Sequence, residues 1–175
     1  GVAYLGADPE RRLCVTTTFW RIATDTRTYE ADDMSGTGAK ITGGRWNDIG
    51  VALSYAAGSR ALACLETVVH LNSGGLPLNR YLVEIIVPDD LLSAAEVATT
   101  DGLAVGWDAE PAGRVSIALG SEWAASMRTA LMLVPSVIVP EESNLLINPA
   151  HPEAARISAR KVRRWTYDPR LVRGT

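Results

Sequence analysis

With 175 residues and 47% hydrophobic side chains, the chain is long enough to bury a core, and its length favours one domain over residues 1–175. Its formal net charge of −3 argues against direct nucleic-acid binding, because phosphate backbones recruit clustered lysine and arginine. No apolar run approaches the roughly 20 residues that span a bilayer, and no signal-peptide pattern opens the chain, so we expect a cytoplasmic protein with no membrane association.

The first half of the chain is predicted to contain two strands, a long polar segment and a helix. In order, these are a strand over 15–22, the polar segment 24–40, a short strand over 51–56 and a helix from the N-cap Ser59 to about Leu71. Within that helix, Leu62, Leu65 and Val69 follow helical spacing and are expected to form a core stripe. A polar segment as long as 24–40 in a small domain is typical of a functional loop.

The second half is predicted to be richer in short strands than in helices. In order, we expect a strand over 80–87, a mixed segment over 89–114, a helix over 121–131, strands over 133–139 and 144–148, a helical turn over 153–158 and a last strand over 161–167. Tyr81, Val83, Ile85 and Val87 should share one face of their strand. The pattern predicts an α+β protein with a bent or split, mostly antiparallel sheet and flanking helices.

Few residues in the chain could hold a metal or form disulfides. Cys14 and Cys64 are far apart and do not form a metal-ligand pattern, and His70 and His151 are too few for a three-histidine site. We therefore expect reduced cysteines and no metal cofactor.

The run Gly43-Gly44-Arg45-Trp46-Asn47 is the first candidate site. The guanidinium of Arg45 offers a fixed fork of donors that suits a diphosphate, although a structural ion pair explains an arginine equally well. The two glycines permit unusual backbone angles or a close approach to a ligand. Asn47 is a candidate ligand contact, or it holds the turn through side-chain to backbone hydrogen bonds.

Three further side chains have chemistry that suits a sugar ligand. Tyr55 has a flat ring and a hydroxyl, so it could stack on a nicotinamide-like ring or simply pack in the core. Glu66 lies in an apolar stretch, where a carboxylate must be paired, solvated or facing a cleft. In a cleft, it could stabilise the positive charge that develops as a glycosidic bond opens. Ser136 is expected in an apolar strand, where its hydroxyl needs a partner.

Taken together and in order, these motifs resemble the RES domain, the toxin half of bacterial Xre–RES toxin–antitoxin pairs. The resemblance runs from about residue 19 to 171 and rests on Phe19-Trp20-Arg21, Gly43 to Asn47 with Gly50, Tyr55, Glu66, Leu78 to Tyr81, Gly120 with Trp123, Val134-Pro135-Ser136, Asn144 to Pro152 and Tyr167 to Leu171. The chain departs from the family pattern at Ser121-Glu122, where many members have an aspartate before the tryptophan.

The resemblance implies a fold similar to ADP-ribosyltransferases and an activity that consumes NAD as substrate. The family's arginine, glutamate and serine would correspond to Arg45, Glu66 and Ser136, with Arg21 as a second arginine and Tyr55 as the family's tyrosine. Arg45 and Arg21 would hold the pyrophosphate, Tyr55 would pack on the nicotinamide side and Glu66 would stabilise the ribosyl cation. Ser136 would position the nicotinamide-side ribose or amide.

Several functions agree with these residues. The first is cleavage of the nicotinamide–ribose bond by hydrolysis or phosphorolysis, which would deplete NAD. The second is transfer of ADP-ribose to a specific host protein, and the third is a noncatalytic regulatory domain with a vestigial site. The resemblance also implies a partner, an Xre-type helix-turn-helix antitoxin that would make any DNA contact.

Overall fold

The computed structural model describes residues 15–70 and 77–172, and its strands form one seven-stranded sheet. The strands are β1 (Thr16–Ala23), β2 (Ser54–Ala57), β3 (Tyr81–Pro88), β4 (Glu96–Val97), β5 (Leu131–Pro135), β6 (Ser143–Ile147) and β7 (Ser158–Arg164). Their order across the sheet is β4-β5-β6-β2-β1-β3-β7, and every neighbouring pair is antiparallel except β4 with β5. The predicted α+β class with a mostly antiparallel sheet is confirmed.

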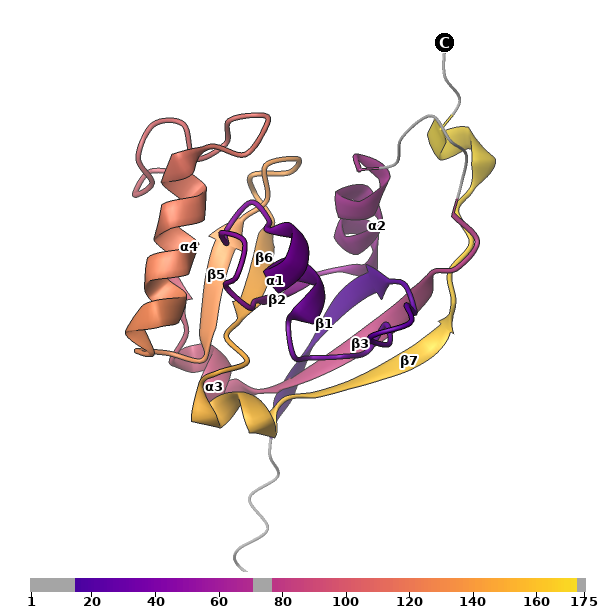
Figure 1. Ribbon diagram of the computed structural model, residues 1–175, viewed down its shortest axis with the longest axis horizontal. Helices are drawn as coiled ribbons and strands as arrows, with labels where there is room; N and C mark the ends of the chain where they lie inside the picture. Colours follow the sequence, from indigo (N-terminus) through magenta and orange to yellow (C-terminus); the bar gives the residue numbers. More distant parts are fainter. Residues whose placement is uncertain (1–14, 71–76, 173–175) are drawn as a thin grey trace, which may run out of the picture.

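The sheet is nearly split between β1 and β2. These two strands are in register at a single pair, Trp20 with Ala57, whereas β1 pairs with β3 over its whole length. Figure 1 shows the consequence: β5, β6 and β2 form one half, and β1, β3 and β7 form a second half that turns away from it. The bent sheet expected from the sequence therefore has its bend at this junction.

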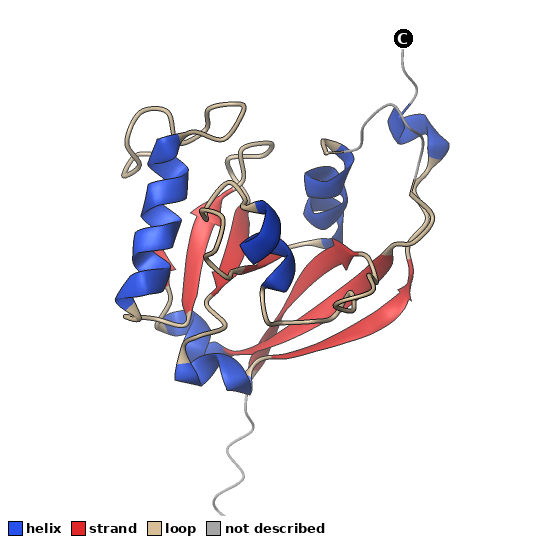
Figure 2. Cartoon of the chain, viewed as in Figure 1, coloured by secondary structure: helices blue, strands red, loops and turns tan. Residues whose placement is uncertain are grey.

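Helices flank both halves of the sheet (Figure 2). The α-helices are α1 (Thr37–Thr42), α2 (Arg60–Val68), α3 (Asp89–Ser93) and α4 (Arg114–Ser126), and the 3-10 helices are η1 (Pro152–Arg156) and η2 (Pro169–Val172). Helix α2 packs against β1 and β2, and α4 lies beside β5. Within the described residues, no helix is both long and apolar enough to cross a membrane.

Alternating side chains of the strands fill separate parts of the core. Val83, Ile85 and Val87 are fully buried on one face of β3, where Tyr81 packs beside them, as predicted. Leu82 points to the opposite face, because side chains alternate along a strand, and it packs in a second cluster that contains residues of α2.

Three tryptophans form the centre of a third cluster beneath α4. Trp46, Trp107 and Trp123 are all buried there, and the rings of Trp46 and Trp107 stack with centroids 6.2 Å apart. Trp46 belongs to the run Gly43 to Asn47, called the glycine-rich turn below, so the cluster joins this turn to the second half of the chain.

Helix α2 begins as predicted but buries different residues. The Ser59 hydroxyl accepts a hydrogen bond from the Leu62 amide at 3.1 Å, which confirms the N-cap. The helix ends at Val68, and the predicted end at Leu71 lies outside the described residues, as does Cys14. The predicted core stripe is wrong beyond Leu62, because the helix turns Leu62, Ala63 and Val68 toward the core, which leaves Leu65 37% exposed. Val69 is likewise exposed.

The predicted helix over 121–131 is wrong at both ends, since α4 begins at Arg114 and ends at Ser126, with Gly120 inside it. Strand β2 begins at Ser54 instead of residue 51, since the Asn47 side chain takes the Val51 carbonyl. Strand β7 also begins earlier than predicted, at Ser158. The prediction of a strand over 133–139 is wrong at its end, since β5 stops at Pro135.

We predict that Gly120→Ala destabilises the protein. An added Cβ would lie 1.9 Å from the Trp46 carbonyl oxygen, so the backbone of the turn would have to move. Alanine is usually about 1 kcal/mol better than glycine inside a helix, but we expect this clash to outweigh that gain and cost at least ~2 kcal/mol of unfolding free energy.

Chemical denaturation of the wild type and of Gly120→Ala measures this loss of unfolding free energy. Gly113→Ser is the matched control on the same helix, because Gly113 is the N-cap, the nearest atom to its added Cβ is 3.6 Å away, and serine is a favoured cap. A Gly120→Ala protein as stable as the wild type would show that α4 does not need this close approach.

Candidate functional site

Asn47 holds the glycine-rich turn together from its centre. Its side chain is almost completely buried, and its Nδ2 donates to the carbonyl oxygens of Ala39 at 2.9 Å, Asp48 at 3.1 Å and Val51 at 2.9 Å. Its Oδ1 accepts from the Tyr55 hydroxyl at 2.5 Å. Both Nδ2 and Oδ1 are occupied, so Asn47 fixes the turn, and its role as a ligand contact stays a prediction.

Tyr55 is fastened to the same turn through its hydroxyl. The oxygen accepts from the Trp46 amide at 3.2 Å while the proton goes to Asn47. Burial raises the pKa of Tyr55 well above its usual value, so the phenol is neutral. Gly44 makes this arrangement possible, because a Cβ there would lie 2.8 Å from the Tyr55 hydroxyl and 2.7 Å from the Asn47 Oδ1.

The structure directs Arg45 toward the segment that precedes α4. Its NH1 donates to the carbonyl oxygens of Ala109 at 2.8 Å and Trp107 at 3.4 Å, and its NH2 pairs with the Glu110 carboxylate at 2.7 Å. The Arg45 side chain is 19% exposed and that of Glu110 is 78% exposed. Both roles considered for Arg45 therefore stay open, with its structural partners now identified.

Arg21 bridges the two halves of the sheet. Its NH1 donates to the Ser54 hydroxyl at 2.7 Å, and its NH2 donates to the carbonyl oxygens of Ala31 at 2.9 Å and Asp33 at 2.8 Å. Its Nε is buried and has no hydrogen-bond partner among the described residues. Burial lowers the pKa of Arg21, while the charges of Asp33 and Asp32 act in the opposite direction.

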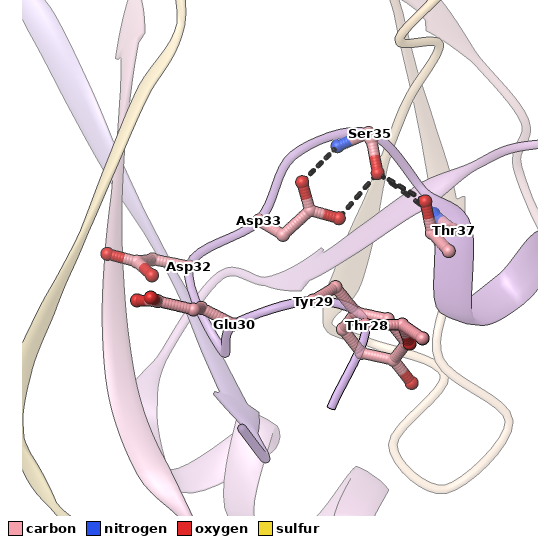
Figure 3. Close-up of a pocket in the computed structure, with 7 residues that line it drawn as sticks. All are labelled: Thr28, Tyr29, Glu30, Asp32, Asp33, Ser35 and Thr37. Carbon is pink, nitrogen blue, oxygen red and sulfur yellow. Dashed lines mark hydrogen bonds between the residues drawn. The ribbon is translucent and has the colours of Figure 1, made fainter. Parts of the chain in front are cut away.

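Two hollows lie beside these residues, under and along the 24–40 segment. The first, of about 180 Å³, is lined by Arg21, Ser54 and Tyr55 together with residues of the segment. The second, of about 310 Å³, is polar, and Figure 3 shows the side chains that line it: Thr28, Tyr29, Glu30, Asp32, Asp33, Ser35 and Thr37. Arg21 and Tyr55, which are 34 positions apart in sequence, thus share one hollow.

Glu66 and Ser136 meet, and Asn144 joins them. The Ser136 hydroxyl donates to the Glu66 Oε1 at 2.8 Å, and the Asn144 Nδ2 donates to the same oxygen at 2.6 Å. Ser136 is fully buried, but it lies in the turn after β5 instead of in a strand, which corrects the expectation from the sequence. Its hydroxyl also accepts from the amides of Ile138 at 3.1 Å and Val139 at 3.2 Å.

Two contacts were missed by reasoning from single motifs. In the sequence, Asn144 stands out only as the first residue of the run Asn144 to Pro152 that supports the resemblance, and its spacing from Glu66 carries no signal of contact. Ser121, where the chain departs from the family pattern, accepts a hydrogen bond from the Asp48 amide at 3.0 Å. That position therefore helps to hold the glycine-rich turn against α4. Within residues 15–70 and 77–172, no three His, Cys, Asp or Glu side chains gather into a possible metal site.

Comparisons with known proteins agree on one family. The family model described as RES domain matches residues 18–169. A protein of Sphingobium sp. (strain YBL2) named Prs ADP-ribosylating toxin is 79% identical over 159 residues, which cover 91% of this chain and 99% of that protein. A protein of Yersinia enterocolitica named Toxin Res is 36% identical over 149 residues, which cover 83% of this chain and 94% of its own.

A solved structure is similar in fold. The chain resembles one from the crystal structure of the M. tuberculosis MbcT-MbcA toxin-antitoxin complex with a TM-score of 0.63, over 84% of this chain and 82% of the other. The sequences are 20% identical in this comparison, so the likeness concerns the fold.

We predict that Arg45 stabilises the fold through carbonyl oxygens more than through its ion pair. Arg45→Ala should lower the unfolding free energy by about 1–3 kcal/mol, because it leaves the carbonyls of Trp107 and Ala109 without their donor. Glu110→Gln should cost less than about 1 kcal/mol, since an exposed ion pair is worth little.

Denaturant unfolding of both variants makes the comparison. Equal losses would show that the ion pair dominates. No loss in Arg45→Ala would show that the structural contacts of Arg45 are dispensable and would favour a role in ligand binding.

Proposed function

This chain belongs to the RES-domain family of toxins, and on that premise we propose that it breaks the nicotinamide–ribose bond of NAD and transfers the ADP-ribose to a protein. It would act in the cytoplasm as the toxin of a toxin–antitoxin pair. The observation that carries the proposal is the Glu66 carboxylate, which two side-chain donors hold by one oxygen.

Glu66 has the chemistry that bond cleavage requires. As nicotinamide leaves, positive charge builds on the ribose, and a fixed carboxylate lowers the energy of that transition state more than the energy of bound NAD. Among the described residues, Glu66 forms no ion pair. Its charge is therefore available to the developing cation.

The arginines and Tyr55 supply the binding side of the proposal. Arg21 and Tyr55 line one hollow, which places a cation for the pyrophosphate beside an aromatic ring for the nicotinamide side of NAD. Arg45 would reach the diphosphate by releasing Glu110. That exchange costs little, because an exposed ion pair contributes only about 1 kcal/mol or less. Asn47 contributes by fixing the turn that carries Arg45.

The relative from Sphingobium favours a protein acceptor. Its name says that it ADP-ribosylates Prs, and it is 79% identical to this chain over nearly its whole length. We therefore propose the corresponding Prs protein as the acceptor. With water as the acceptor the product would be free ADP-ribose, and with phosphate it would be ADP-ribose phosphate. The products therefore distinguish transfer to a protein from simple consumption of NAD.

We predict that the purified chain releases nicotinamide from NAD and that Glu66→Gln slows this release at least about 100-fold, because the variant lacks the charge that stabilises the cation. Chromatography of a time course, with and without phosphate and with and without purified Prs, measures nicotinamide, ADP-ribose and its phosphate. Mass spectrometry of Prs measures the added group.

Glu122→Gln is the matched control, because it makes the same chemical change at an exposed position of α4. Modified Prs supports the proposed acceptor. Rapid formation of free ADP-ribose or its phosphate, with Prs unmodified, would favour NAD hydrolysis or phosphorolysis. Equal rates for Glu66→Gln and the wild type would remove Glu66 from the chemistry.

An antitoxin is the partner that we propose, of the Xre type with a helix-turn-helix domain, covering the NAD site. The similar fold was solved as a toxin-antitoxin complex, which supports a partner of this general kind. Size-exclusion chromatography of the two purified proteins should show one complex, and nicotinamide release should fall as antitoxin is added. Separate elution with undiminished release would contradict this pairing.

A further inference from the structure

Two side chains hold Glu66 at the same carboxylate oxygen. Ser136 and Asn144 both donate to Oε1, and Oε2 accepts no hydrogen bond from the residues that the structure describes. Resting on the proposed function, we propose that Asn144 is a positioning residue that aims Oε2 of Glu66 at the glycosidic bond. Asn144 acts through Glu66 and does not itself contact NAD.

The backbone of Asn144 is fixed from both sides. Asn144 lies on β6, where it pairs with Ala57 of β2 and with Val134 of β5. A strand with neighbours on both sides cannot shift without breaking two ladders of hydrogen bonds. The Asn144 amide is therefore a rigid support for a carboxylate that comes from a separate helix, α2.

The Asn144 side chain has a single contact of this kind. Its 2.6 Å hydrogen bond to Glu66 is the one that the described residues record for it, and its Oδ1 is buried without a partner. A side chain whose role was to stabilise a turn would bond to the backbone, as Asn47 does. The amide of Asn144 is thus committed to the orientation of Glu66.

Ser136 shares the task but also supports the fold. A hydroxyl can donate one hydrogen bond and accept two, and Ser136 uses all three, with Glu66, Ile138 and Val139. Removing it would disturb the turn after β5 as well as Glu66. Asn144 therefore gives the cleaner test, and Ser136 is fully occupied without a ligand.

The test compares Asn144→Asp and Asn144→Ala with the wild type in steady-state nicotinamide release. Aspartate keeps the shape of asparagine but has no donor for Glu66 when ionised. We expect kcat to fall about 10- to 100-fold in both variants with KM changed less than about twofold, because the support acts on the transition state. A normal kcat in Asn144→Asp would overturn the inference. A raised KM with unchanged kcat in either variant would overturn it too.

Thr67→Val is the matched control on the same helix. Thr67 accepts a hydrogen bond from the Tyr167 hydroxyl at 2.8 Å, so the variant removes a side-chain contact of α2 that does not involve Glu66. Its kcat should stay within about twofold of the wild type. A fall in kcat as large as that of the Asn144 variants would show a general effect of loosening α2 and would overturn the inference.

A second readout needs no substrate. In protein labelled with ¹³C at glutamate side chains, the Glu66 carboxyl signal is assigned by its loss in Glu66→Gln. This signal should move in Asn144→Ala and stay in place in Thr67→Val, and an unmoved signal in both overturns the inference. A wild-type chain that releases no nicotinamide and modifies no protein would overturn the proposed function and the inference with it. An active wild type with fully active Asn144 variants overturns the inference alone.

Discussion

The hydrogen bond between Arg21 and Ser54 lies at the weakest part of the sheet, and the rest of the structure depends on it. Strands β1 and β2 share one residue pair, so the ladder alone holds the two halves loosely. The Arg21 guanidinium adds a 2.7 Å bond to Ser54 and also ties down the carbonyls of Ala31 and Asp33. One buried cation thereby joins both halves of the sheet to the 24–40 segment.

The same junction gathers the proposed catalytic groups. Ala57 pairs with Trp20 on one side and with Asn144 on the other, so the support for Glu66 is placed one strand away from the split. Helix α2 starts almost immediately afterwards, at the N-cap Ser59, and carries Glu66 back toward β6. A short connection between a strand and its helix is thus enough to place the carboxylate over Asn144.

Short stretches of sequence were sufficient to predict those elements whose formation depends on neighbouring residues. The β-branched run of β1 and the cap at Ser59 were predicted because each is decided within a few residues. The true start of α4 was not predicted, and the close approach of its Gly120 to the Trp46 carbonyl depends on a segment more than 70 positions away. Local propensity cannot reveal such packing.

For the candidate site too, the sequence identified individual residues but not the contacts between distant ones. Glu66 and Ser136 were singled out as polar side chains in apolar stretches and again by the resemblance to the RES domain, and the structure brings them together. The contact of Asn144 with Glu66 spans 78 positions, and the carbonyl partners of Arg45 lie 62 and 64 positions away. Under the proposed function, these partners give the two residues different tasks. Glu66 is fixed by a rigid sheet, as charge stabilisation requires, while Arg45 pairs with an exposed carboxylate that a diphosphate could replace. A cation can exchange an exposed partner for the ligand as it binds, whereas a carboxylate that must match the transition state gains from being held in advance.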